Sequence, residues 1–117
     1  MNTINDDLYN LILESAYGFD TGSLWLSILN EFPDESLDNR KEIFLDVMSR
    51  LLKEGKARLA LQVYLEGSTD DQINQFRDAW PQWDDIDEDT FWVRKDGVAC
   101  TPGGLVWVYE NGAEVWT

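Results

Sequence analysis

Residues 105–116, with the sequence Leu-Val-Trp-Val-Tyr-Glu-Asn-Gly-Ala-Glu-Val-Trp, decide the fold class of this chain. Two runs of apolar and β-prone residues, 105–109 and 113–116, lie on either side of the pair Asn111-Gly112. Asn-Gly accepts the positive φ angles of a type I′ turn, which makes it the strongest short signal for a β-hairpin with a two-residue loop. The sequence therefore predicts that the chain ends in an antiparallel hairpin.

Further strand and turn signals precede this hairpin. Apolar side chains occur at every second position of residues 58–65, at Leu59, Leu61, Val63 and Leu65, which is typical of a half-buried strand. A continuation of helix is the alternative for this stretch, because Ala and Leu tolerate both states. Residues 91–93 form a short candidate strand, and Gly97 and Pro102-Gly103-Gly104 mark turns. We expect a small, mainly antiparallel sheet.

Helical periodicity dominates the first half of the chain. The clearest helix is expected over residues 36–54, with Ser36 as its N-cap and Gly55 just after its end. Its apolar stripe consists of Phe44, Val47, Met48, Leu51 and Leu52. The width of this stripe predicts a helix that belongs to the core and packs on one side only.

Two shorter helices are expected before it. The first begins near Asn5 and stops at Gly18, with Leu8, Leu11, Ile12 and Ser15 on one face. The second is capped by Thr21 or Ser23 and ends before Pro33.

A fourth helix is expected after Gly67. Ser68 and Asp71 resemble a capping box, although the Asp side chain is shorter than the usual Glu. Its apolar face consists of Ile73, Phe76 and Trp80, and Pro81 lies just beyond its end. The chain is therefore expected to be a single α+β domain over residues 1–117, with N-terminal helices packed on a small, mainly antiparallel sheet and a C-terminal hairpin.

Tryptophan and cysteine usage add two expectations. Six tryptophans are present, and most should be core residues, Trp107 and Trp116 helping to fix the sheet and one or two others serving as interface anchors. The single Cys100 cannot form an internal disulfide, and no stretch approaches the ~20 apolar residues of a membrane span. With no signal-peptide pattern, we expect a cytoplasmic protein that does not contact membranes.

The charge of the chain is strongly negative. The sequence contains 23 acidic and nine basic residues, which gives a formal net charge of −14. The carboxylates are concentrated after residue 65, namely Glu66, Asp70, Asp71, Asp78, Asp84, Asp85, Asp87, Glu88 and Asp89, with Arg77 as the one cation among them. Such a field repels nucleic acid and anionic membranes and attracts a basic partner. The alternative is that the charge only keeps a small domain soluble.

The residue types argue against an enzyme. There is no histidine, so Ser-His-Asp and Cys-His arrangements are excluded, and Cys100 has no CxxC partner. The acidic run 84–89 lacks the glycine and the later bidentate Glu of an EF-hand loop. We therefore expect no catalytic residues, no metal site and no cofactor.

A binding role is therefore the remaining interpretation, and the acidic run 84–89 is the first candidate for the binding site. The segment from Trp83 to Trp92 should be a surface loop, because it lies between a helix and a strand. Carboxylates beside aromatics can fill a cationic groove and compete with the phosphates of a nucleic acid. The expected contact residues are Asp84, Asp85, Asp87, Glu88, Asp89 and Trp83, followed by Asp70 and Asp71 on the preceding helix.

Three stretches of the sequence carry a resemblance to a known family. They are residues 50–56 (Arg-Leu-Leu-Lys-Glu-Gly-Lys), residues 65–81 from Leu-Glu-Gly-Ser to Trp-Pro, and residues 100–117, with Cys-Thr-Pro-Gly-Gly-Leu-Val-Trp-Val at the start and Glu-Val-Trp-Thr at the end. The chain resembles a family of small acidic bacterial proteins, a former domain of unknown function linked to immunity in contact-dependent growth inhibition. Gly104, Trp107 and Trp116 would then be fold determinants.

The resemblance implies an immunity protein that binds and neutralises a cognate toxin domain and has no catalytic residues. Together with the charge, it predicts that the partner is a basic, RNA-cleaving nuclease whose substrate groove is occluded by an acidic surface. The alternative is a nucleic-acid mimic that inhibits or regulates a host nucleic-acid-binding protein. The sequence leaves the oligomeric state open.

Overall fold

The computed structural model describes residues 6–61, 63–80 and 103–117. Its elements are α1 (Asp6–Ala16), α2 (Thr21–Glu31), α3 (Leu37–Lys53), β1 (Ala57–Leu61), β2 (Val63–Tyr64), α4 (Thr69–Ala79), β3 (Gly104–Val108) and β4 (Glu114–Trp116). Helices thus dominate the first part of the chain and a small sheet closes it, so the predicted α+β class is confirmed. The expected strand at 91–93, the turn at Gly97, and Cys100 lie outside the described residues.

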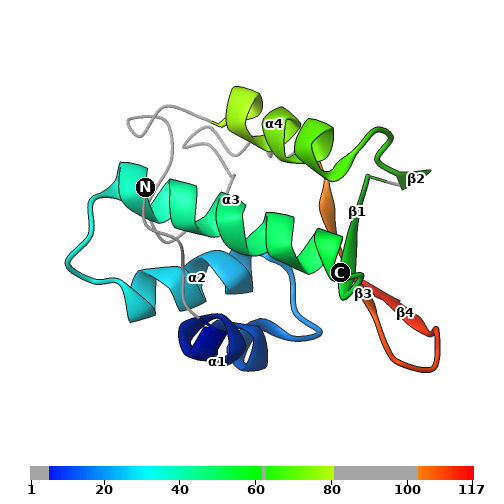
Figure 1. Cartoon of the computed structure of the whole chain (residues 1–117), viewed down its shortest axis with the longest axis horizontal. Helices are drawn as coiled ribbons and strands as arrows, with labels where there is room; N and C mark the ends of the chain where they lie inside the picture. Colours follow the sequence, from blue (N-terminus) through cyan, green and yellow to red (C-terminus); the bar gives the residue numbers. More distant parts are fainter. Residues whose placement is uncertain (1–5, 62, 81–102) are drawn as a thin grey trace.

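The central element is α3, which lies between α2 and α4 (Figure 1). The hydroxyl of Ser36 caps it by accepting a 3.1 Å hydrogen bond from the N–H of Asn39, and Gly55 follows at φ 73°. These ends are as predicted. The expectation that α3 packs on one side only is wrong, because α2, α4 and β1 all contact it and bury Ile43 and Leu45 as well.

The first helix has the predicted ends but a different buried face. Gly18 adopts φ 82° after α1, as a C-terminal stop requires. The buried side chains are Tyr9, Ile12 and Ala16, whereas Leu11 is 43% exposed. The helix is rotated from the prediction because the Tyr9 hydroxyl reaches inward and donates a hydrogen bond to Glu54. Tyr9 is therefore part of the core, whereas Leu11, which was expected there, is not.

The N-cap of α2 is Asp20, and not Thr21 or Ser23 as predicted. Its Oδ1 accepts a 2.9 Å hydrogen bond from the N–H of Ser23, and Thr21 is instead a buried residue of the first turn. Asp and Ser are nearly equivalent as N-caps, so the choice depends on where the chain leaves the preceding turn. The helix ends before Pro33, as expected.

The predicted capping box of α4 is present. The Ser68 hydroxyl accepts a hydrogen bond from the Asp71 N–H at 3.1 Å, and the Asp71 carboxylate accepts one from the Ser68 N–H at 3.2 Å. Ile73 and Phe76 are buried, and Trp80 packs edge-on against Trp25 at 5.6 Å between ring centroids. The expected apolar face of α4 therefore attaches this helix to the rest of the core.

The sheet has the strand order β2-β1-β3-β4, and each neighbouring pair is antiparallel. The single strand expected over 58–65 is wrong, because the chain reverses so that Leu61 pairs with Val63 and Ala60 with Tyr64. Paired residues of antiparallel strands point to the same face. After this tight reversal, the odd-numbered pair Leu61 and Val63 still lies on one face and the even-numbered pair Ala60 and Tyr64 on the other. The sequence pattern of the two strands is therefore the same as that of one continuous strand.

The C-terminal hairpin is confirmed, but its loop is one residue longer than predicted. The N–H of Gly112 donates to the carbonyl of Tyr109, and the N–H of Tyr109 donates to the carbonyl of Ala113, each at 2.9 Å. Gly112 has φ 86°, and Asn111 Oδ1 accepts a hydrogen bond from the Ala113 N–H. This is a three-residue loop with glycine in the left-handed region, and not a two-residue type I′ turn.

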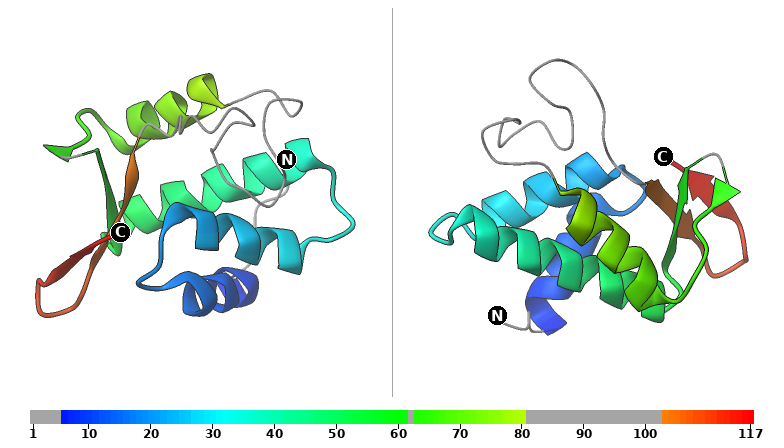
Figure 2. Two further views of the ribbon diagram at one scale, coloured as in Figure 1. Left: turned by 180° about the vertical axis from the view of Figure 1, so that it is seen from behind. Right: turned by 90° about the horizontal axis from the view of Figure 1, so that it is seen from above.

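One face of the sheet joins the helical core. Leu59, Leu105 and Trp107 pack with the buried residues of the helices, and the Trp107 indole N–H donates a 2.7 Å hydrogen bond to the carbonyl of Phe19. Both views of Figure 2 show the sheet at one end of the helical part, with the hairpin of β3 and β4 projecting away from the helices. Among the described helices, none combines the length and the apolarity needed to cross a membrane.

Candidate functional site

Two of the predicted contact residues lie in the first turn of α4, and the structure separates their roles. Asp71 is part of the capping box and accepts the N–H of Ser68. Asp70 is 80% exposed, and its Oδ1 lies 3.7 Å from Lys53 Nζ on α3. Asp70 therefore points to solvent, whereas Asp71 supports the helix start. The other expected contacts, Asp84, Asp85, Asp87, Glu88, Asp89 and Trp83, lie outside the described residues.

Asp70 also lines a polar groove of about 380 Å³ between α3 and α4. The other residues that line it are Leu45, Asp46, Ser49, Lys53, Ile73, Asn74 and Arg77. Burial raises the pKa of Asp46, and the nearby Glu42 carboxylate raises it further. Arg77 is paired with Glu42 across the same two helices. Because both signs of charge line the groove, it can take up a polar side chain but offers little to an apolar ligand.

Within residues 6–61, 63–80 and 103–117, every basic side chain is engaged inside the molecule. Arg40 is buried and donates to the carbonyls of Phe32 and Pro33, and Lys41 lies 5.5 Å from the centre of the Trp80 ring. The others form ion pairs: Arg50 with Asp6 and Glu54, Lys53 with Asp70, Lys56 with Glu54, Arg58 with Glu114, and Arg77 with Glu42. Each described cation therefore already contacts a group of the same molecule, although the side chains of Lys53 and Arg58 remain 60% and 51% exposed.

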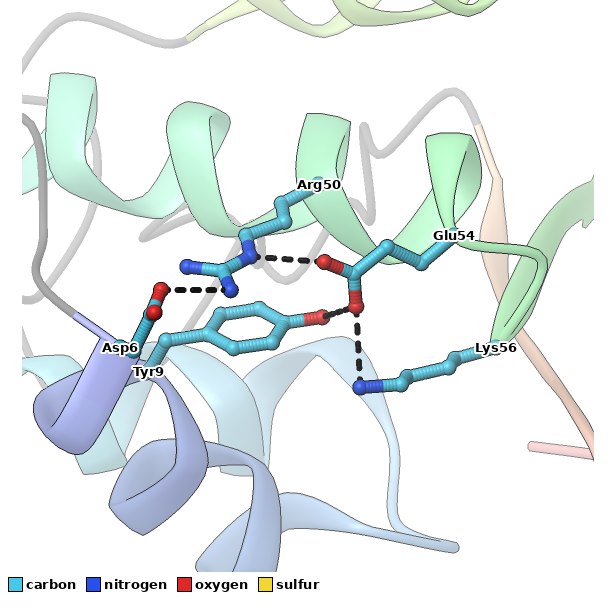
Figure 3. A network of polar contacts seen from close by, with 5 residues as sticks. All are labelled: Asp6, Tyr9, Arg50, Glu54 and Lys56. Atoms are coloured by element: carbon cyan, nitrogen blue, oxygen red, sulfur yellow. Dashed lines mark hydrogen bonds and ion pairs between the residues drawn. The ribbon is translucent and has the colours of Figure 1, made fainter.

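The densest of these networks connects α1, the end of α3 and the start of β1 (Figure 3). Glu54 accepts a hydrogen bond from Tyr9 at 3.1 Å and forms ion pairs with Arg50 at 2.8 Å and Lys56 at 2.9 Å. Arg50 also reaches Asp6 at 2.8 Å and stacks over the Tyr9 ring. These five residues hold three elements together, and each charge among them is paired with another member of the network.

The same contacts shift two pKa values in opposite directions. Hydrogen bonds, first from Arg50 and then from Lys56, lower the pKa of Glu54 to about 2. Burial and the adjacent Glu54 carboxylate raise the pKa of Tyr9. In the described part of the chain, no three His, Cys, Asp or Glu side chains come together as a metal site would need. We therefore interpret this network as structural.

Several exposed carboxylates contrast with the engaged cations. Within the described ranges, Asp7, Glu14, Glu31, Asp34, Glu66, Asp78 and Glu110 are exposed and form no ion pair. They come from α1, from α2 and the turn after it, from the segment before α4, from the end of α4 and from the hairpin loop. Part of the negative charge is therefore displayed to solvent without a cation of this chain beside it.

The outer face of the sheet carries an aromatic cluster, consisting of Arg58, Tyr64, Glu114 and Trp116. Arg58 stacks on the Tyr64 ring at 3.4 Å, and the Tyr64 and Trp116 rings are 5.2 Å apart. Glu114 accepts a hydrogen bond from the Tyr64 hydroxyl, which raises the pKa of Tyr64, and lies 3.8 Å from Arg58. Trp116 is 50% exposed. Trp, Tyr and Arg are the residue types enriched at binding hot spots.

Sequence reasoning assigned Trp116 to the sheet but did not find this cluster. Its members are brought together by pairing between distant segments, since Arg58 lies opposite Val106, and Val106 lies opposite Trp116. The only local signal was the alternation that places Arg58 and Tyr64 on the same polar side of residues 58–65. The cluster thus depends on strand order, which the sequence pattern does not specify.

Comparisons with known proteins place the chain in a family. A solved structure, an uncharacterized protein conserved in bacteria from Neisseria meningitidis, superposes with a TM-score of 0.73 at 20% sequence identity, covering 94% of this chain and 87% of that one. This likeness shows that the two chains share a fold. No curated protein matches the chain. The sequence profile of a family described as "protein of unknown function, DUF596" matches residues 52–117. The chain therefore belongs to the DUF596 family.

Proposed function

We propose that this protein is an immunity protein that binds and neutralises a basic toxin domain, an RNA-cleaving nuclease of a contact-dependent inhibition system. The observation that carries the proposal is the difference between the cations, which are paired within the molecule, and the carboxylates, many of which are not. Every described cation contacts a group of the same molecule, whereas many carboxylates of a chain with net charge −14 point to solvent without an ion pair. A surface of this kind favours a cationic partner and disfavours direct contact with RNA or DNA.

The charge acts in two stages in this proposal. At a distance, the field of the whole protein raises the rate of encounter with a basic domain, and salt weakens that effect. In contact, carboxylates occupy the positions at which the nuclease binds the phosphates of its substrate. Asp70 is one proposed contact, and the acidic run Asp84, Asp85, Asp87, Glu88 and Asp89 supplies others, with Trp83 as an apolar anchor beside it. Substrate is excluded without any chemistry by this protein, in keeping with a chain that contains no histidine.

The acidic surface also supports a second candidate function. A nucleic-acid mimic that sequesters a host DNA- or RNA-binding protein needs the same charge density. Gene order discriminates the two, because an immunity gene follows the reading frame of the toxin's large secreted carrier protein. A lone gene in a phage-like neighbourhood favours mimicry.

The test uses the C-terminal domain of the secreted protein encoded directly upstream. Stopped-flow association with this domain should be fast at low salt and should slow as ionic strength rises. Replacing Asp85 and Asp87 with Lys should cost several kcal/mol of affinity, because the coupling energies of close charge pairs across an interface are about 1.5–7 kcal/mol.

A matched control separates local contact from net charge. Asp7→Lys with Glu14→Lys makes the same change of charge on α1, at exposed carboxylates that form no ion pair among the described residues. This variant should bind somewhat more slowly but should dissociate at the wild-type rate. Equal losses in both double variants would assign the effect to net charge alone. Association rates that do not change with salt would contradict the steering.

A further inference from the structure

The outer edge of β4 lacks a partner strand in the described part of the chain. The order β2-β1-β3-β4 places β4 at one end of the sheet, and its hairpin projects from the helices (Figures 1 and 2). Proteins usually protect such edges with Lys, Pro or a bulge, because exposed edges recruit other strands. The sequence of β4 is Glu-Val-Trp, with Val115 and Trp116 both exposed. The strand is short and carries one charged side chain, Glu114, but it contains neither a lysine nor a proline.

The hydrogen-bond pattern shows which main-chain groups face outward. Tyr109 donates to Ala113, and Thr117 donates to Leu105, so the hydrogen-bonded pairs of the hairpin are the odd-numbered ones. In an antiparallel ladder, the residues between such pairs turn their N–H and C=O groups away from the partner strand. The main-chain groups of Glu114 and Trp116 therefore point to the free edge, where another strand could bind them.

The side chains beside this edge define the chemistry of its occupant. Trp116 offers a half-exposed indole ring that is already held in place by Tyr64. Glu110 is exposed in the adjacent loop, and Glu114 lies on the same face as Trp116. A second copy of this chain is disfavoured, because each copy carries a net charge of −14. An extended segment with Lys or Arg beside an apolar residue matches these groups.

We propose that β4 is a docking strand, to which the basic partner protein adds an extended segment as a further strand, with Trp116 as the apolar anchor. This inference rests on the proposed function, since the partner is the toxin domain. Main-chain hydrogen bonds to Glu114 and Trp116 contribute affinity, and the flanking glutamates select a basic segment. The hairpin that completes the sheet thereby also serves as an interaction element.

A proline pair tests the main-chain part of the proposal. Glu114→Pro removes the outward N–H, and an edge strand tolerates proline where the N–H faces solvent. Glu114→Ala removes the same side chain but keeps the N–H, so the comparison isolates the main-chain group. By isothermal titration calorimetry with the upstream-encoded toxin domain, Glu114→Pro should bind at least about tenfold more weakly than Glu114→Ala.

A second pair tests the anchor. Trp116→Ala should weaken binding by about 30-fold, the effect of losing a hot-spot residue. Val63→Ala removes an exposed apolar side chain from β2, at the other end of the sheet, and should bind as the wild type does. Melting curves of all four variants show whether each is folded.

Hydrogen exchange of the wild-type complex gives a readout that needs no variant. The amides of Glu114 and Trp116 should exchange more slowly in the complex than in the free protein. Unchanged exchange at these two amides, or equal affinities of Glu114→Pro and Glu114→Ala, would overturn the docking strand while the immunity function still holds. A toxin domain that does not bind the wild-type protein would overturn both proposals.

Discussion

Trp107 and Trp116 lie on adjacent strands of one hairpin and have opposite surroundings. Trp107, on β3, is fully buried, stacks against Tyr17 at 4.8 Å and donates its indole N–H to Phe19. Trp116, on β4, is half exposed and touches Tyr64 on the other face of the sheet. The comparison teaches that strand alternation gives the hairpin one face for the fold and another that is open to a partner. The same residue type can therefore serve stability in one place and binding in the other.

The largest expected effect comes from truncating each tryptophan in turn. Trp107→Ala should lower the free energy of unfolding by about 3–5 kcal/mol, because it leaves a cavity between the sheet and the helices. Trp116→Ala should lower it by a smaller amount, about 1–3 kcal/mol, since about half of the residue's surface already contacts water. Urea denaturation measures both values. Similar losses for the two variants would remove the distinction between the two faces.

A substitution in the hairpin loop should lower the free energy of unfolding by less than the loss of Trp107, and it should affect both faces of the hairpin. Gly112 has φ 86°, and its N–H closes the loop with Tyr109. Gly112→Val places a β-branched residue in the left-handed region and should destabilise the protein by about 1–3 kcal/mol. The space around a Cβ at this position is open, so the cost is one of backbone conformation and not of steric overlap. Gly112→Asn is the control and should cost less, because Asn tolerates that region. An unchanged denaturation midpoint for Gly112→Val would show that the loop assignment is wrong.

The pH dependence of stability tests the role of the charges that are paired within the molecule. The folded-state pKa of Glu54 is about 2, below its ordinary value of 4.5, so folding favours the charged form. Its contribution is present above about pH 4.5 and is lost as pH falls toward 2. The stability difference between the wild type and Glu54→Gln should therefore shrink across this window in denaturation series. A difference that stays constant from pH 6 to about pH 2 would contradict the assigned pKa.

The outward-facing carboxylates should have the smallest effect. Glu66→Gln with Asp78→Asn should leave the free energy of unfolding within about 0.5 kcal/mol of the wild type, or slightly above it, because like-charge repulsion is relieved. Thermal melting at low salt measures the change. A marked loss of stability would mean that these side chains support the fold, which would weaken the contrast between paired and unpaired charges.

Local signals predicted most of the fold. Ser36 and Gly55 fixed the ends of α3, and Ser68 with Asp71 fixed the start of α4, because capping depends on residues within one turn. The reversal between β1 and β2 could not be predicted, since it keeps the two-residue period of the sequence. The three-residue hairpin loop was missed because Asn-Gly fits two loop lengths.

The candidate site was less accessible to sequence reasoning. The net charge and the exposure of Asp70 follow from composition and from position in a helical turn. The pairing of Arg58 with Glu114 and the stacking of Tyr64 on Trp116 depend on contacts between segments far apart in the chain. The role of Tyr9 was missed for the same reason, since Tyr9 lies on α1 and its partner Glu54 lies 45 residues later, at the C-terminal end of α3. Such contacts are set by tertiary packing and leave no periodic trace.

The central claim is that this acidic protein neutralises a basic, RNA-cleaving toxin by direct binding. The most direct measurement is the rate of RNA cleavage by the upstream-encoded toxin domain, titrated with the purified protein at concentrations well above the dissociation constant. We predict that the rate falls linearly and reaches zero at one molecule of this protein per toxin domain. Cleavage that continues unchanged in the presence of excess protein would contradict the claim.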